Sequence, residues 1–361
     1  MNKTIARALI AILGLGVAAY LVAAHGIDQI FRALQLAGWS GLAAVAAVHA
    51  ISTLLCGFAW WLLLRAYSPV RWPTFTWVRW IRDGLDSVVP ILPVGGELIG
   101  MRMLALRGVA LADAGTVVDL TAELLTQAGF AALGLALLHF NHPRAGYQSW
   151  IAIGVGVMAL QYLGFLYAQR KGLFRLIQHP FDWLTKRTRE PANDEPLHER
   201  ILTIYRENGA FLANLALHFV AWIVTGLEIW VGLRFMGQPR SVADVLILES
   251  LVYAIRSITF FVPLGAGVQE GGYVLIGGLL GLDPSLALAV ALLKRGRDVL
   301  IGLPALLCWQ LLEARGFKRA QPSAAATAAA PLGTESPLSG AAEAVASGDS
   351  IVAVDPAISG E

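Results

Sequence analysis

The residues best placed to do chemistry in this sequence are two glutamates, Glu97 and Glu270, each of which stands in an apolar segment interrupted by proline and glycine. The two segments cover residues 83–108 and 256–283. Their helix-breaking residues are Pro90, Pro93, Gly95, Gly96, Pro263, Gly265 and Gly267. A broken helix frees backbone N–H groups that can bind an ionic group beside the carboxylate. Each glutamate therefore has two roles open to it: contact with a transported substrate, or capping of its own broken helix.

A second pair of carboxylates, Asp119 and Glu123, is spaced four residues apart, which places both on one face of a helix. They are candidates for contact with a substrate. Alternatively, they lie near the cytoplasmic end of their helix, where they are solvated or pair with Arg102 or Arg107. Arg102 follows Glu97 by about one turn, and it can either hold a phosphate or extend its head to the membrane surface.

Charged residues also interrupt the last apolar stretch, residues 285–313, in its middle. They are Lys294, Arg295, Arg297 and Asp298. A continuous helix over this stretch would be ~43 Å long, which predicts a buried cluster with Lys294 and Asp298 spaced to pair. The alternative is a polar loop between two short segments. A buried cluster needs counter-ions, and the candidates are Glu123, Glu228 and Glu249.

Known catalytic and metal-binding motifs are absent from the sequence: it has no HExxH, Walker A or GxSxG pattern. The two cysteines, Cys56 and Cys308, lie in apolar runs, which does not fit a disulfide framework or a metal cluster. We therefore expect no cofactor and no metal. His49 and His218 also lie in apolar runs, and we expect them to form hydrogen bonds between helices rather than a proton relay.

The composition identifies the class of protein that must position these residues. Of 361 residues, 57% are hydrophobic and 14% charged, whereas soluble domains are about one quarter charged. This excludes a soluble globular enzyme and a disordered protein. The apolar blocks are about twenty residues long, which is the length of a membrane-spanning helix. The sequence predicts an all-α, polytopic transmembrane bundle, and its net charge of +2 is too small for a nucleic-acid partner.

The apolar runs predict the individual spans. They are 6–24, 43–64, 115–139, 149–168, 211–235 and 285–313. Residues 242–261 are also long enough to span, which leaves two alternatives: they cross the membrane, or residues 242–282 dip into it from the periplasm. The first run resembles a signal peptide, but we expect it to remain as a span because the rest of the chain is equally apolar. Residues 25–41 form a short, mildly amphipathic segment.

Positive charge predicts the orientation of the spans. Arginines that alternate with tryptophans follow the second span, and this pattern is typical of a cytoplasmic interface; they are Arg65, Arg71, Arg79 and Arg82. The loop 170–209 and the end of the last stretch are also basic. We expect both termini in the cytoplasm, a transmembrane domain over residues 1–315 and a disordered tail over 316–361, which is rich in alanine, proline and serine.

The two broken segments resemble each other. Pro90, Glu97 and Gly108 recur as Pro263, Glu270 and Gly281, always 173 residues later. If one segment enters from the cytoplasm and the other from the opposite side, the halves form an inverted repeat, as in secondary transporters. The alternative is chance recurrence in a chain with 37 glycines.

These motifs resemble the family of the lysylphosphatidylglycerol synthase transmembrane region, also called flippase-like. The resemblance rests on PLGAGVQEG at 263–271, PVGGE at 93–97 and LLKR at 292–295, and it covers residues 5–315. Residues 92–100, followed by Asp119, Glu123 and Gln127, are most similar to the branch associated with hopanoid biosynthesis. The matching motif residues are Glu97, Arg102, Glu270 and Arg295.

The resemblance implies a lipid-handling membrane protein. Relatives that make aminoacylated lipid carry a soluble aminoacyltransferase domain, and an alanine-rich tail stands in its place here, so we do not expect the synthase reaction. We expect a flippase or lipid-transport component of the bacterial inner membrane, acting on a hopanoid or an anionic phospholipid. Arg102, Lys294, Arg295 and Arg297 would hold the headgroup, and Glu97, Glu123 and Glu270 would balance them. The alternatives are a membrane-embedded enzyme and an assembly scaffold, with lipid-synthesis enzymes as partners.

Overall fold

The computed structural model describes residues 27–88, 95–143, 197–206, 208–259, 262 and 267–320, together with a few positions between 149 and 164. The expected spans 6–24 and most of 149–168, most of the loop 170–209 and the tail beyond 320 lie outside the described residues. So do the expected breaks Pro90, Pro93, Pro263 and Gly265. The chain divides into two units, Met1–Leu312 and Glu313–Glu361, and the site described below belongs to the first.

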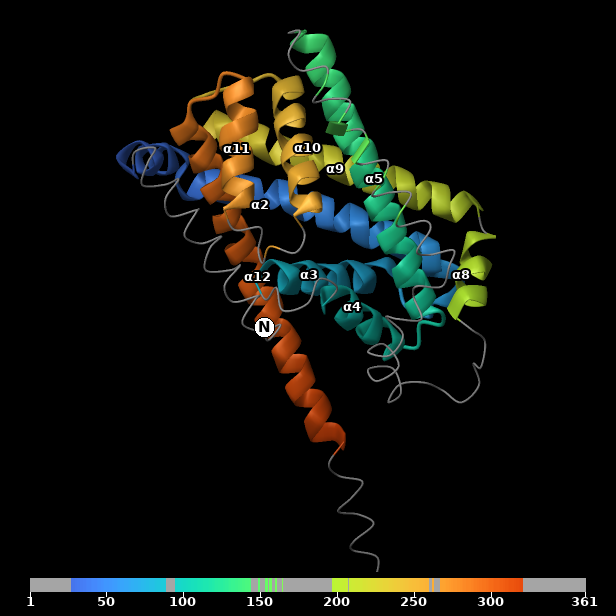
Figure 1. The fold of residues 1–361 in the computed structure, drawn as a ribbon. Coiled ribbons are helices and arrows are strands. Elements are labelled where there is room, and N and C mark those ends of the chain that lie inside the picture. Colours follow the sequence, from blue (N-terminus) through green and yellow to red (C-terminus); the bar gives the residue numbers. More distant parts are fainter. Residues whose placement is uncertain are drawn as a thin grey trace, which may run out of the picture. The chain divides into compact units, whose positions relative to one another are not determined.

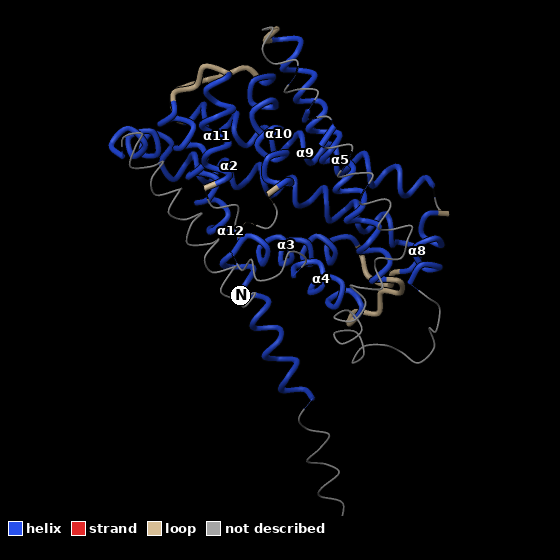
Figure 2. Tube along the Cα trace, in the orientation of Figure 1, coloured by secondary structure: helices blue, strands red, loops and turns tan. Residues whose placement is uncertain are grey.

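The regular structure in the described part of the chain is helical throughout (Figures 1 and 2). The elements are α2 (Ile27–Leu64), η1 (Arg65–Tyr67), α3 (Trp72–Val88), α4 (Gly95–Ala105), α5 (Ala112–Asn141), α8 (Leu197–Tyr205), α9 (Asn208–Phe235), α10 (Val242–Ile258), α11 (Val268–Leu279) and α12 (Pro284–Ala320). Helix α2 joins two helices across non-helical backbone at Gly38 (φ 55°), so that the described residues of the expected short segment 25–41 form a short helix before the longer apolar one.

Three helices among the described residues are long and apolar enough to cross a membrane: Leu34–Tyr67, Ala112–Asn141 and Gly209–Phe235. Many of their apolar side chains face outward, which suits contact with lipid chains. The prediction of an all-α helical membrane protein is confirmed. Helix α12 continues through its charged cluster, so the alternative of a polar loop at this point is wrong.

Each glycine- and proline-rich segment separates two short helices, as the sequence predicts. Helices α3 and α4 have 17 and 11 residues, and α10 and α11 have 17 and 12. A helix needs about 20 residues to cross the hydrocarbon layer. All four are shorter than this, and α4 and α11 are too short to span the layer alone.

The helices repeat with the spacing found in the sequence. Adding 173 to Gly95, the start of α4, gives Val268, the start of α11. The same shift relates Gly108 (φ 76°) to Gly281 (φ 70°), two glycines whose left-handed backbone follows α4 and α11 respectively. The same order of elements thus occurs twice: a long helix, two short helices separated by a break, and a second long helix. The first set is α2, α3, α4 and α5, and the second is α9, α10, α11 and α12.

A contact between equivalent residues supports the repeat in three dimensions. Ser52 on α2 and Thr225 on α9 are also 173 residues apart, and their side-chain oxygens lie 3.2 Å from each other. Equivalent residues of two halves lie this close where a two-fold axis passes near them. The contact is therefore the one expected for an inverted repeat whose halves meet at α2 and α9.

Two buried apolar clusters hold these elements together. One joins α9 to α12 with parts of α2 and α5, and it contains Tyr273 and Leu233. The other joins α3, α4 and α8 to α2 and α5, and Trp60 packs edge-on against Phe75 within it. The apolar clusters leave a polar region between the two halves, which contains the site.

Close packing of α2 on α3 depends on Gly57. A Cβ atom at this position would lie 2.4 Å from the Thr76 Cα atom, which is backbone and cannot move aside. We expect Gly57→Ala to lower the free energy of unfolding by about 1–3 kcal/mol. The matched control is Gly278→Ala in α11, where nothing lies within 4 Å of the added atom. Thermal unfolding in detergent measures both, and equal melting temperatures would contradict the packing argument.

Candidate functional site

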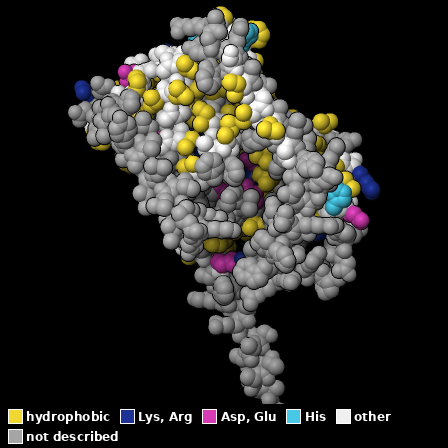
Figure 3. Space-filling view, in the orientation of Figure 1, with side chains coloured by type: hydrophobic (Ala, Val, Ile, Leu, Met, Phe, Trp, Pro, Cys, Tyr) yellow, Lys and Arg dark blue, Asp and Glu magenta, His cyan; other side chains and the backbone are white. Residues whose placement is uncertain are grey.

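A cavity of about 230 Å³ lies where the two halves meet, and its lining is rich in charged side chains. Its cations are Arg79, Arg82, Arg256, Lys294 and Arg297, and its acids are Asp83, Asp86, Glu97, Glu123 and Asp298. Figure 3 shows acidic side chains in a hollow below a largely apolar region. Both broken segments contribute, because α3, α4, α10 and α11 all carry lining residues.

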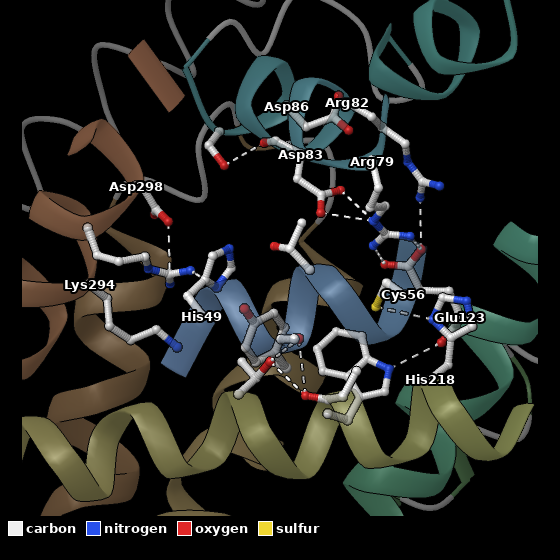
Figure 4. Close-up of a pocket in the computed structure, with 18 of the residues that line it drawn as sticks. His49, Cys56, Arg79, Arg82, Asp83, Asp86, Glu123, His218, Lys294 and Asp298 are labelled. Atoms are coloured by element: carbon white, nitrogen blue, oxygen red, sulfur yellow. Dashed lines mark hydrogen bonds and ion pairs between the residues drawn. The ribbon is translucent and has the colours of Figure 1, made fainter. Parts of the chain in front are cut away.

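The first charge network joins α3 to α5 (Figure 4). Arg79 donates from both terminal nitrogens to the Glu123 carboxylate, at 3.0 and 2.8 Å. Arg82 donates to the same carboxylate at 2.8 Å and lies 3.3 Å from Glu97. The two arginines are only 5% and 2% exposed. They serve as counter-ions for buried carboxylates, and a cytoplasmic interface at this end of α3 stays a prediction.

Asp119 lies at the end of this network and is fully buried. One carboxylate oxygen accepts from Asn214 and contacts the His218 ring, both at 2.9 Å, and the other lies 3.4 Å from Arg82. The expectation that Asp119 and Glu123 are solvated is wrong for Asp119, which pairs with residues of α3 and α9, while the Glu123 carboxylate pairs with arginines of α3. His218 bridges helices, as expected, since its second ring nitrogen contacts Cys56 of α2 at 3.6 Å.

The second charge network joins α12 to α9 and α10. Lys294 contacts Glu249 directly and lies 3.9 Å from Glu228, while Arg297 lies 3.2 Å from Glu228. Glu228 also contacts the His49 ring at 2.9 Å. Two of the three expected counter-ions are therefore present, and the third belongs to the first network. The pairing expected between Lys294 and Asp298 gives way to one between Arg297 and Asp298, at 3.3 Å.

The two broken helices are capped differently. Glu270 accepts from the Gly267 N–H of its own helix at 2.8 Å, and its other oxygen accepts from Arg295 at 3.1 Å. At the start of α4 the Gly96 N–H donates to Asp86 of α3, at 2.9 Å. Glu97 instead pairs with Arg82, and its second oxygen is buried without a hydrogen-bond partner. The capping role thus belongs to Glu270 and to Asp86.

The sequence-predicted site residues divide into two groups. Glu97, Glu123, Lys294 and Arg297 line the cavity. The others lie outside its lining; they are Arg102, Asp119, Glu270 and Arg295. Of the predicted breaks that the structure describes, Gly95 and Gly96 open α4, and Gly267 precedes α11 with a φ of 75°.

Sequence analysis missed two stripes of lining residues. The stripe on α3 is Arg79, Arg82, Asp83 and Asp86, and the stripe on α2 is His49, Ser52, Thr53 and Cys56. Both have the spacing i, i+3, i+4, i+7, which places polar side chains on one helical face. The same spacing of polar residues is visible in the sequence and could have identified both stripes. In the part of the chain that the structure describes, no three His, Cys, Asp or Glu side chains are arranged to hold a metal ion.

The buried ion pair between Glu249 and Lys294 predicts that Glu249→Gln greatly lowers the free energy of unfolding. Among the described carboxylates, the change leaves Lys294 with Glu228, 3.9 Å away, and both Glu249 and Lys294 are buried. We expect unfolding in detergent to become easier by about 3 kcal/mol. The control is Asp244→Asn, whose partner His142 lies 3.1 Å away in a partly exposed pair, and we expect a loss below about 1 kcal/mol. Similar losses for both variants would show that the buried pair is unimportant.

Comparisons with known proteins agree with the motifs. The model of the lysylphosphatidylglycerol synthase TM region matches residues 5–305. No curated protein matches the chain, and no solved structure matches it. Because the matched range includes the charged cavity and both broken segments, the chain belongs to the family of the lysylphosphatidylglycerol synthase transmembrane region.

Proposed function

We propose that this protein is a lipid flippase or a component of lipid transport, and that the cavity receives the polar headgroup of the lipid. The observation that supports it is a single charged cavity lined by both broken segments of an otherwise apolar helical protein. A headgroup in the cavity would be sheltered from hydrocarbon while its chains stay in the lipid. Broken helices that meet at a substrate site are the arrangement used by many secondary transporters.

The cost of burying charge supports this proposal. Ionisable groups at membrane depth cost about 2.5–3.5 kcal/mol each on insertion scales and generally mark a substrate or ion path. Five cationic and five acidic side chains line this one cavity. A purely structural role would be served as well by apolar packing, because replacing buried ion pairs with apolar residues is often neutral for stability.

Arg256 is the lining cation best suited to a phosphate. It stands near the end of α10, just before the second break, and its guanidinium lies 5.9 Å from the centre of the Tyr253 ring. Among the described residues, no carboxylate forms an ion pair with it. The other four lining cations are in ion pairs. Of the lining cations, Arg256 is therefore the one whose charge no described carboxylate neutralises, which suits it to a ligand.

The remaining candidates have supporting roles in this proposal. Lys294 and Arg297 provide positive potential from the cavity wall, and Glu97 and Glu123 balance it. Arg295 acts indirectly, by holding the Glu270 cap at the start of α11. The lipids that suit these groups are an anionic phospholipid, bound through its phosphate, and a hopanoid with a polar headgroup, bound through hydroxyl groups.

Transport is tested with the purified protein in vesicles that contain a fluorescent anionic phospholipid. We expect Arg256→Gln to slow its movement between leaflets by roughly tenfold, since a charge-assisted hydrogen bond to phosphate contributes about 1.5–3 kcal/mol. The matched control is Arg234→Gln on α9, because Arg234 also lies over an aromatic ring, Trp230, at 4.4 Å, but is outside the cavity lining. Equal rates for both variants, or no movement with the wild type for any tested lipid, would refute the proposal.

Lipid analysis of a deletion strain separates the alternatives. Altered leaflet distribution with unchanged lipid chemistry fits transport. A changed lipid mass that wild type restores and Glu97→Gln does not restore fits a membrane-embedded enzyme. Unchanged lipids with buried-charge variants that still fold would favour a scaffold for lipid-synthesis enzymes.

The proposed location is the bacterial inner membrane, with both termini in the cytoplasm. This orientation follows from the basic residues of the predicted loops and of the end of the last stretch, because positively charged loops stay on the cytoplasmic side. We expect a green fluorescent protein fused after residue 361 to fluoresce and an alkaline phosphatase fused there to be inactive. An active phosphatase fusion would reverse the orientation.

A further inference from the structure

A thiol, an imidazole and a carboxylate form a continuous chain at the edge of the cavity. The Cys56 Sγ atom lies 3.6 Å from the His218 Nδ1 atom, and the His218 Nε2 atom lies 2.9 Å from the Asp119 Oδ1 atom. Cys56 and His218 both line the cavity, and Figure 4 shows the thiol directed at the ring. A nucleophile within reach of a base that is itself oriented by a third group is the signature of covalent catalysis.

The three groups are held firmly by their surroundings. They come from three helices, α2, α9 and α5, so that their meeting depends on tertiary packing. Asp119 is fully buried, and the same oxygen that contacts His218 accepts from Asn214 at 2.9 Å. With Nε2–H donated to Asp119, the imidazole presents Nδ1 to the thiol as an acceptor. The ring is thus oriented to take the thiol proton.

Other polar groups lie at the same edge of the cavity. Arg79 lines the cavity together with Cys56 and His218. Thr53 precedes Cys56 by three residues on the same face of α2 and lines the cavity. Its hydroxyl is a donor available to a developing oxyanion. Headgroup transport requires none of these features, because Asp119 already has Arg82 as a counter-ion.

We propose that Cys56 is a nucleophile activated by His218 and positioned by Asp119, and that it takes the acyl group of a carboxylic ester carried by a membrane lipid. The inference does not rest on transport. It assigns a covalent activity to a cysteine that the sequence places in an apolar run.

The reaction balances without an oxidant or a reductant. His218 removes the Cys56 proton, the sulfur attacks the ester carbonyl carbon, and a C–S bond forms. The tetrahedral intermediate collapses with loss of the ester C–O bond, and His218 returns the proton to the departing alkoxide, which leaves as an alcohol. Water, or a hydroxyl or amine acceptor, then loses a proton to His218 and attacks the thioester. The C–S bond breaks, and the thiolate regains the proton.

The first test is alkylation of the full-length protein with iodoacetamide at neutral pH, read by mass spectrometry of each cysteine peptide. Cys308 is the internal control, because it is more exposed than the buried Cys56 and the chain has two cysteines in all. Burial alone predicts slower reaction at Cys56. We expect Cys56 to react at least about tenfold faster than Cys308, because His218 lies within reach of its thiol and can remove the proton, and His218→Gln to abolish the difference. Slower reaction at Cys56 than at Cys308 would overturn the proposal.

The second test is acylation with p-nitrophenyl acetate. We expect a burst of p-nitrophenol that is stoichiometric with the protein and an acetyl group on the Cys56 peptide. Cys56→Ser should lack the burst, and Cys308→Ser should keep it. If His218→Gln does not fold, as judged by gel filtration, the comparison of the wild type with the two serine variants tests the proposal without it. An acetyl group absent from Cys56, or a burst that survives Cys56→Ser, would overturn the proposal.

Discussion

Charge pairing in an apolar interior is the constraint on which the rest of the structure depends. Breaking a buried pair by removing one partner costs about 3–5 kcal/mol, so the helices that carry these charges must meet in register. Arg79 and Arg82 of α3 both reach Glu123 of α5, and Lys294 of α12 reaches Glu249 of α10. Each half of the molecule is thereby fixed internally by its own network.

Contacts between the halves complete these networks. His218 of α9 joins the first network, which is built on α3 and α5, and His49 of α2 joins the second, which is built on α12 and α10. Each histidine thus lies on the long helix of the opposite repeat. Because α2 and α9 meet at Ser52 and Thr225, a rotation of one half against the other would change both networks together. That coupling suits a protein that presents one cavity to two sides of a membrane.

Transport and thiol chemistry would share one cavity without competing for the same atoms. The cations on α10 and α12 provide positive potential, while Cys56 and His218 lie beside the carboxylate network of α3 and α5. A headgroup held by its phosphate could therefore bring an ester towards the thiol. Binding energy from the charged part of a lipid would then position its reactive part, which is the usual source of specificity in covalent catalysis.

The sequence by itself determined the class of protein, the broken segments, the repeat spacing and the continuous charged helix, because these follow from composition and from local backbone propensities. It also indicated that Glu228 and Glu249 would be counter-ions for the cations of α12. Tertiary structure alone decided that Arg79 and Arg82 turn inward, that Asp86 caps α4, and that Cys56 meets His218 and Asp119. These are contacts between helices distant in sequence. Periodicity gives the face of a helix on which a side chain lies, but only the packing of helices gives the partner that the face meets.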